Sequence, residues 1–354
     1  MAEKLGGADT EAGLRRAAAP TLVDVARIAG VSVSTAGRVM RDSGWPVDAG
    51  LKERVREAAV QVGYVPNILA RTLRGSAPAL IGLVAGNMLD PYYGEIADAV
   101  TRHAEASHKM LAMVCNMQRD PTLELKYCRQ LWEHRVAGLI LAGGGFDQIT
   151  HHDELAAILR QMVGSGVVVT TLSPRGVDAP SFCVDNRRVG QMAAAELIEH
   201  GHRHVGIIMG QVRNEVRRQR LEAMLETFAA SGIIPAICDV NGDDGAAVAA
   251  FLRMHPDVTG IVSSTHAISV GIINAVRRSG RTVPDEISVV AIGNAKLAEW
   301  SMPRLTHIDL NLEDCGRAAL DHIAVAVSGK LQRPWKSPLP RLIRGESVVG
   351  IVAG

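Results

Sequence analysis

Aromatic residues are scarce in this 354-residue chain, which holds four each of Trp, Tyr and Phe. A packed core must therefore be built from Ala, Val, Ile and Leu, as in layered α/β proteins whose parallel strands are buried on both faces. Hydrophobic residues make up 47% of the chain and charged residues 21%, which excludes global disorder. The length predicts two or three domains.

Cysteines are also few. The five are scattered along the chain, and no two form a Cys-x-x-Cys motif. This argues against a disulfide framework or a structural zinc site and indicates a reducing compartment. No apolar run approaches the roughly 18 residues of a membrane span. The first 20 residues mix charges with Ala and Gly and lack the apolar stretch of a signal peptide. We expect a disordered arm over residues 1–19, a cytoplasmic location and no membrane partner.

Neither sign of charge dominates, but the small net charge of +1 is unevenly spread. Residues 1–75 hold 11 Lys and Arg against eight Asp and Glu, a net charge of +3, and the rest of the chain carries −2. A basic module on an acidic body weakly indicates a polyanionic partner.

Three short helices are predicted within residues 20–65. Thr21 is a good N-cap for the first helix and Gly30 ends it, whereas Ser32 is the N-cap of the second. A third helix over about 48–62 has its apolar residues on one face. Two short helices joined by a tight turn fit a helix-turn-helix unit. Spacing alone leaves an ordinary three-helix packing module equally open.

Two motifs favour the helix-turn-helix. Residues 21–32, Thr-Leu-Val-Asp-Val-Ala-Arg-Ile-Ala-Gly-Val-Ser, resemble the DNA-binding headpiece of the lac repressor family. Residues 63–67, Gly-Tyr-Val-Pro-Asn, together with Ala70, Leu73 and Gly75, resemble the hinge of that family. The motifs occur in order and at nearly the usual distance, and the resemblance continues to about Ser347. It implies a small all-α headpiece followed by a two-lobed α/β core with parallel sheets, similar to periplasmic binding proteins.

The same resemblance implies where the domains lie. The helix-turn-helix domain occupies residues 20–65 and the hinge helix and linker residues 66–77. The effector-binding and dimerisation domain occupies residues 78–354.

By match to the family, the base-reading positions are Val33, Ser34 and Arg38. The second helix would lie in the major groove with its first residues facing base edges. Arg38 can pair bidentately with guanine, and Val33 can touch a thymine methyl group. A solvated helix face is the alternative for Arg38.

Other positions match family contacts that hold the DNA without reading bases. Contacts to phosphates are implied for Thr21, Ser32, Thr35 and Asn67. The hinge would fold on DNA, and Leu73 would act as an apolar wedge in the minor groove, with Ala70 also assigned to DNA contact. A core position is the alternative for Leu73. Ala36 and Gly37 stand where the family usually has Val and Ser, and the connection over residues 42–46 is one residue longer.

Strands and helices alternate twice along residues 76–354, which predicts parallel sheets with helices on both faces. Ligands of such sheets bind beyond the carboxyl ends of the strands, here in a cleft between two lobes. Strands are expected at about 80–84, 110–114, 136–142, 167–171, 205–209, 237–240, 260–263 and 287–292.

The effector residues are implied by the resemblance alone. Arg218 matches the family arginine that holds the ligand, and Tyr92 and Tyr93 match the position of a group that covers it. Alternatives are a surface salt bridge for Arg218 and plain core for the tyrosines. Asp185 matches a family aspartate near the interlobe region, with a structural role as the alternative.

Two departures from the family concern charge in the cleft. Thr265-His266 stands where many members have Asn-Asp, and Gly293-Asn294 where many have paired Asp. Loss of these carboxylates, together with an arginine and His266, favours an anionic effector such as a sugar acid or a phosphorylated sugar, contacted also by Asn294.

Signals for other chemistry are weak. His200, His202 and His204 lack an acidic or Cys cluster for a metal site. The glycines at 143–145 do not form a dinucleotide fingerprint, so no cofactor is expected. No catalytic motif indicates an enzyme.

We therefore expect a homodimeric transcription repressor that binds a palindromic double-stranded operator under the control of a small sugar or sugar-derived anion. A solute-binding protein for transport and an α/β enzyme acting on a sugar or nucleotide are the alternatives, and the headpiece argues against both. Because the chain ends soon after the last core motif, we expect a dimer rather than a tetramer.

Overall fold

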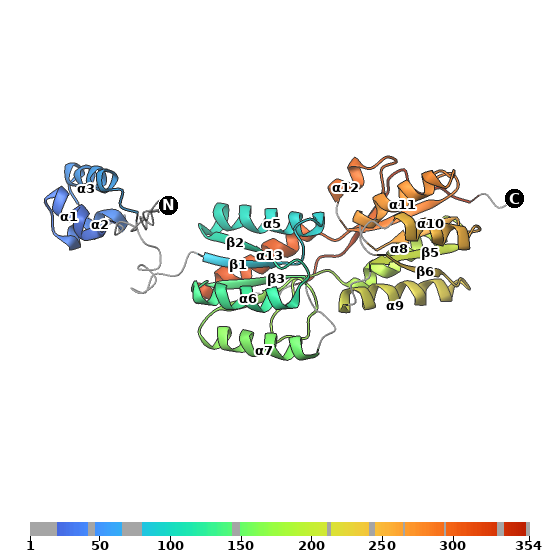
Figure 1. Cartoon of the computed structure of the whole chain (residues 1–354), viewed down its shortest axis with the longest axis horizontal. Coiled ribbons are helices and arrows are strands. Elements are labelled where there is room, and N and C mark those ends of the chain that lie inside the picture. The colour runs from blue at the N-terminus through green and yellow to red at the C-terminus, as the bar shows by residue number, and fades with distance from the viewer. Residues whose placement is uncertain are drawn as a thin grey trace, which may run out of the picture. The chain divides into compact units, whose positions relative to one another are not determined.

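Residues 20–41, 47–65, 80–143, 149–210, 214–240, 245–264, 266–293, 295–330 and 336–351 are described by the computed structural model. The chain divides into two units, residues 1–76 and 77–354 (Figure 1). Several predictions lie outside the described residues: those for the arm at 1–19, for Asn67, Ala70 and Leu73, for Asn294, and for the side chain of His266.

The first unit contains the three predicted helices, α1 (Leu22–Ala29), α2 (Val33–Arg41) and α3 (Ala49–Val62). Thr21 and Asp24 form a capping box at the start of α1, and Gly30 ends that helix in the left-handed region at φ 65°. Asp48 caps α3, accepting a hydrogen bond from the Leu51 N–H at 3.1 Å. The helices share a small apolar core made of Val25, Ala26, Ala29, Ala36, Val39, Val55, Ala58 and Ala59.

The second unit has two lobes, and the first contains a four-stranded parallel sheet in the order β2-β1-β3-β4. Its strands are β1 (Leu80–Ala85), β2 (Leu111–Asn116), β3 (Gly138–Ala142) and β4 (Val168–Thr171). Its helices are α5 (Pro91–His103), α6 (Pro121–Glu133), α7 (Ile149–Gly164) and α13 (Leu312–Val327), and a π-helical turn, η1 (Ala104–His108), extends α5.

The second lobe contains a six-stranded sheet in the order β10-β9-β8-β7-β5-β6, parallel except for the antiparallel pairing of β10 with β9. The strands are β5 (Val205–Gly210), β6 (Ala236–Val240), β7 (Gly260–Ser263), β8 (Ser288–Gly293), β9 (Thr306–Asp309) and β10 (Arg341–Ile343). The helices are α8 (Asn186–Glu199), α9 (Glu215–Ala230), α10 (Gly245–Met254), α11 (His266–Arg278) and α12 (Ala295–Trp300).

The two lobes exchange segments that are distant in sequence. After β9 in the second lobe, the chain returns to the first lobe as α13, which packs on α5 (Figure 1). A Cβ at Gly316 would lie 3.1 Å from Val100, so this glycine lets the two helices approach closely. One cluster of buried apolar side chains runs through both lobes. None of the described helices is long and apolar enough to cross a bilayer.

Candidate functional site

The positions predicted to read DNA bases lie on the outer face of α2. Val33 is 45% exposed, and Ser34 and Arg38 are exposed as well. Ser32 caps the helix, because its Oγ accepts a hydrogen bond from the Thr35 N–H at 3.1 Å, and the two hydroxyls lie 2.8 Å apart. The first turn of α2 is thus fixed, and it presents small polar and apolar groups of the kind that contact base edges.

Two residues that differ from the family pattern, Ala36 and Gly37, lie on the inner face of α2. Ala36 and Gly37 are both buried, as is Val39. The replacements therefore alter the packed side of the helix and leave the outer residues Val33 and Arg38 in place. Thr21 is engaged locally, since its Oγ1 donates to Asp24 Oδ2 at 2.8 Å.

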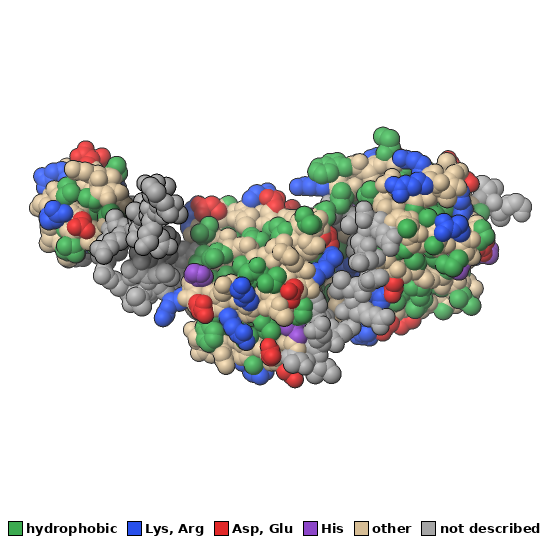
Figure 2. Space-filling model, viewed as in Figure 1, with side chains coloured by type: hydrophobic (Ala, Val, Ile, Leu, Met, Phe, Trp, Pro, Cys, Tyr) green, Lys and Arg blue, Asp and Glu red, His purple; other side chains and the backbone are tan. Residues whose placement is uncertain are grey.

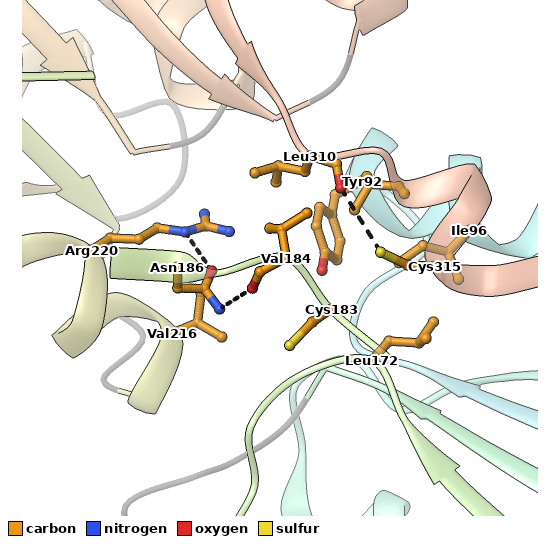
Figure 3. A pocket seen from close by; sticks show the side chains of 11 residues that line it. Tyr92, Ile96, Leu172, Cys183, Val184, Asn186, Val216, Arg220, Leu310 and Cys315 are labelled. Carbon is orange, nitrogen blue, oxygen red and sulfur yellow. Dashed lines mark hydrogen bonds between the residues drawn. The ribbon is translucent and has the colours of Figure 1, made fainter. Parts of the chain in front are cut away.

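A small pocket lies between the lobes, beyond the carboxyl ends of the strands (Figure 3). Its volume is about 310 Å³, including the part open to solvent. Most of its wall is aliphatic or sulfur-containing, and its polar groups are Tyr92, Asn186 and Arg220. The other lining residues are Ile96, Leu172, Cys183, Val184, Val216, Leu310, Leu312 and Cys315.

Arg220 is the charged group of this pocket. The residue is only 9% exposed, and its Nε donates a hydrogen bond to Asn186 Oδ1 at 3.0 Å (Figure 3). Among the residues that the structure describes, no acidic side chain lines the pocket and no carboxylate pairs with Arg220. Burial lowers the pKa of this guanidinium. A buried cation without a counter-charge is costly, so the pocket favours a ligand that brings negative charge or several hydrogen-bond acceptors.

Arg218 does not line the pocket, so the prediction that it holds the ligand is wrong. Arg218 lies on the outside of α9, with its side chain 57% exposed, and it pairs with Glu215 and with Glu222 at 2.8 Å. The pocket arginine is Arg220, two residues further along, and two residues correspond to about 200° around a helix. The buried positions Ala223, Met224 and Phe228 identify the inner face of α9, and Arg220 follows the same spacing.

The two tyrosines differ in position. Tyr92 lines the pocket, and burial raises the pKa of its hydroxyl. Tyr93 packs edge-on against Tyr92, with ring centroids 4.9 Å apart and ring planes at 81°. A Cβ at Gly86 would lie 2.4 Å from the Tyr93 ring, so the absence of a side chain there makes room for it. Tyr93 therefore supports Tyr92 from behind.

Two further groups of predicted residues have structural partners. Asp185 is the N-cap of α8, and its Oδ1 accepts from the Arg188 N–H at 3.1 Å. The imidazole nitrogens of the three neighbouring histidines face different partners: His200 Nδ1 the Glu196 carbonyl, His202 Nδ1 the Thr259 hydroxyl, and His204 Nδ1 the Asp257 carboxylate.

Sequence reasoning missed Asn186, Cys183 and Cys315 as pocket residues. Cys183 and Asn186 follow β4, and Cys315 comes from α13. The signal available in advance was the apolar spacing along α9, which selects Arg220 over Arg218.

Comparison with known proteins agrees with this geometry. Residues 21–67 match the model for the lacI family of bacterial regulatory proteins, and residues 194–348 match the periplasmic binding protein-like domain. The chain is 27% identical to the HTH-type transcriptional regulator DegA of Bacillus subtilis over 328 residues, which cover 90% of this chain and 95% of DegA. The chain therefore has the DNA-binding domain of the lacI family, followed by a periplasmic binding protein-like domain. It is 26% identical to the regulator GalR of Escherichia coli, over 93% of this chain and 95% of GalR.

Solved structures of regulators show the same fold as this chain. The lac repressor dimer bound to operator and the anti-inducer ONPF superposes with a TM-score of 0.78 at 21% identity, covering 93% of this chain and 99% of the repressor. The regulator CelR in complex with cellobiose gives a TM-score of 0.64 at 26% identity, with the same coverage. The headpiece and the two-lobed core with its largely parallel sheets therefore have the fold of the lac repressor, and the relatives that cover the chain are transcription regulators, not enzymes.

Proposed function

We propose that this lacI-family regulator is a homodimeric repressor whose affinity for a palindromic operator is set by a small anion in the interlobe pocket. The sugar acids and phosphorylated sugars are the effector classes that fit best. The proposal rests on Arg220, which is a buried cation. Within the described structure its guanidinium makes one hydrogen bond, to Asn186. A carboxylate or phosphate would supply the missing negative charge and accept from the two free ends of the planar guanidinium.

The rest of the pocket supports a small, partly hydroxylated ligand. The Tyr92 ring and the aliphatic wall suit the carbon face of such a molecule, and Asn186 can bind a hydroxyl. In the comparison proteins, GalR is described as a transcriptional regulator, and CelR is seen with cellobiose.

The same geometry supports coupling between effector and DNA. Arg220 and Asn186 belong to the second lobe, and Tyr92 and Ile96 belong to the first. A ligand that touches both groups has different affinities for open and closed lobe arrangements, and it shifts the balance between them. That shift would change how the two hinge segments of a dimer meet on the operator.

A homodimer is supported by apolar side chains on the surface of the second lobe. Trp300 is 76% exposed and Met302 is 83% exposed, and green atoms stand out over α12 in Figure 2. Exposed apolar groups of this size favour a protein interface.

Two measurements test the proposal. Selection of random duplexes by the full chain should recover an inverted repeat with half-sites about one helical turn apart, and its binding should fall steeply with salt. A thermal-shift screen should then compare each neutral sugar with its acid and its phosphate. A ligand at 100 times its Kd adds about 2.7 kcal/mol. Recovery of unrelated sequences, or stabilisation by neutral sugars alone, would contradict the corresponding half of the proposal.

A further inference from the structure

A second cluster of ligating side chains lies far from the effector pocket, at the other end of α5. His103 ends α5, His108 ends the π-helical turn η1, and Asp321 lies on α13. The Nε2 atoms of both imidazoles lie 2.7 Å from the same atom, Asp321 Oδ1. All three ligating atoms fall within 4.8 Å of one another. The sequence predicts no metal site, because Asp321 is 218 and 213 residues away from the two histidines.

The π-helical turn is what brings the histidines together. Residues five apart point about 140° away from each other around an α-helix. In a turn closed by i to i+5 hydrogen bonds they lie on nearly the same side. His103 and His108 accordingly have ring centroids 5.2 Å apart, nearly perpendicular to each other. Turns of this kind are frequently found at functional sites.

We propose that His103, His108 and Asp321 bind a divalent transition-metal ion of the zinc class. Two imidazoles and one carboxylate form a donor set typical of zinc sites that keep a position open for water or another ligand. Ligand atoms around a tetrahedral zinc ion lie about 3.3 Å apart, a spacing that small side-chain rotations reach from the observed one. Imidazole disfavours Ca²⁺ and Mg²⁺, which prefer oxygen ligands.

The surroundings of the cluster fit an exchangeable ion. The side chains of His103 and His108 are 20% and 22% exposed, and that of Asp321 is 51% exposed, so solvent reaches the site. Ser107 Oγ lies 3.1 Å from His103 Nδ1. With the ion bound, Nδ1–H would donate to this hydroxyl and leave the Nε2 lone pair for the metal. The nearby cations Arg102 and Lys109 pair with Asp98 and Glu105.

The backbone holding these side chains is well packed. Ile96, Val100 and Ala104 are buried under α5 and η1, and Ala319 and Ile323 are buried under α13. An ion at this site would tether η1 to α13. It would thereby fix the far end of the helix whose first turn carries Tyr92, roughly 16 Å from His103 along α5. The metal site does not depend on the identity of the effector.

Titration of the untagged, EDTA-treated full chain with Co²⁺, followed by visible absorption, tests the site. We expect one Co²⁺ per chain, with bands of a low-coordinate nitrogen and oxygen site, no cobalt–thiolate band, displacement by Zn²⁺ and no displacement by Mg²⁺. His108→Ala and Asp321→Ala should abolish the signal. Ser107→Ala should weaken binding by a factor of about 10 or more.

His204→Ala is the matched control, because His204 Nδ1 pairs with Asp257 at 2.8 Å on the surface of the other lobe. It should bind Co²⁺ like the wild type. Zn²⁺ should raise the Tm of the wild type and of His204→Ala, and leave that of His108→Ala and Asp321→Ala unchanged. The milder variants His103→Gln and Asp321→Asn answer the same question if an alanine variant fails to fold. Absence of a Co²⁺ signal, or an unchanged signal in folded His103→Gln and Asp321→Asn, would overturn the proposal.

Discussion

The guanidinium of Arg220 is joined to helix α8 by a hydrogen bond from its Nε to Asn186 Oδ1, at 3.0 Å. Helices α8 and α9 approach so closely here that a Cβ at Gly190 would lie 2.3 Å from the Arg220 backbone oxygen. The position of Arg220 therefore depends on Gly190, which has no side chain and lies one turn beyond Asn186 in α8.

Gly190→Ala should displace this part of α9 and with it Arg220. Because the clash is with backbone, we expect a loss of about 1–3 kcal/mol in the free energy of unfolding, measured in urea, and a weaker thermal shift with effector. Gly94→Ala is the matched control, since a Cβ at Gly94 in α5 meets nothing within 4 Å. It should keep or raise stability. Equal behaviour of the two variants would contradict the packing argument.

Arg38→Ala should weaken specific operator binding and relax base preference. A bidentate contact to guanine discriminates by about 1–3 kcal/mol, so the ratio of operator to random-duplex affinity should fall roughly 5- to 150-fold. Fluorescence anisotropy at fixed salt measures this ratio. Arg27→Ala, an exposed change on α1, should leave base preference intact. A uniform loss on both duplexes would instead assign Arg38 to phosphate contact.

A buried charge cluster in the first lobe makes stability depend on pH. Glu124 is fully buried; its Oε2 lies 2.8 Å from His151 Nε2, and its other oxygen accepts from Arg175. Burial by itself raises the pKa of Glu124, but the Arg175 guanidinium and the His151 hydrogen bond outweigh it and hold the pKa below its usual range. The ionised carboxylate therefore stabilises the fold above the unfolded pKa of about 4.5, and this stabilisation is lost as the pH falls through the lowered folded value.

Glu124→Gln should cost about 3–5 kcal/mol at pH 7, because Arg175 would remain buried without its counter-charge. The difference from the wild type should shrink below about pH 4.5, where the wild-type carboxylate loses its advantage. Urea unfolding at a series of pH values measures the difference. A gap that stays constant down to pH 3 would show that charge is not the source of the effect.

Trp300→Asp combined with Met302→Asp should weaken the dimer. Charge placed on an apolar interface opposes its burial, so light scattering should show a shift from dimer to monomer at micromolar concentration. Operator affinity should fall with it, since a monomer contacts one half-site. Val60→Asp, also on an exposed apolar residue (81%) but in the first unit, serves as the comparison and should remain dimeric. An unchanged mass for the double variant would place the interface elsewhere.

The local features of the fold were predictable from sequence, and the long-range ones were not. Caps and apolar spacing predicted α1 to α3, and the alternation of apolar runs predicted the strands from β1 to β8. The return of α13 to the first lobe depends on packing against α5, which no local pattern reports. Strand β9 and the antiparallel edge strand β10 were missed for the same reason.

The candidate site shows the same division. Tyr92 and the outer face of α2 follow from motifs, but a motif match within Arg217-Arg218-Gln219-Arg220 does not settle which arginine faces inward. The helical phase of Ala223 and Phe228 does settle it. Asn186 and Cys315 reach the pocket from separate elements, so only the three-dimensional structure brings them to Arg220.

Calorimetric titration of matched ligands into the wild type, Arg220→Met and Arg218→Met tests the central claim most directly. The ligands are a neutral sugar, its acid and its phosphate. The sugar is the one whose series gives the largest thermal shift. We expect an acid or a phosphate to bind the wild type and Arg218→Met more tightly than the neutral sugar does, and Arg220→Met to lose this preference. Preferential binding of the neutral sugar, or an anion that binds Arg220→Met as well as the wild type, would contradict this claim.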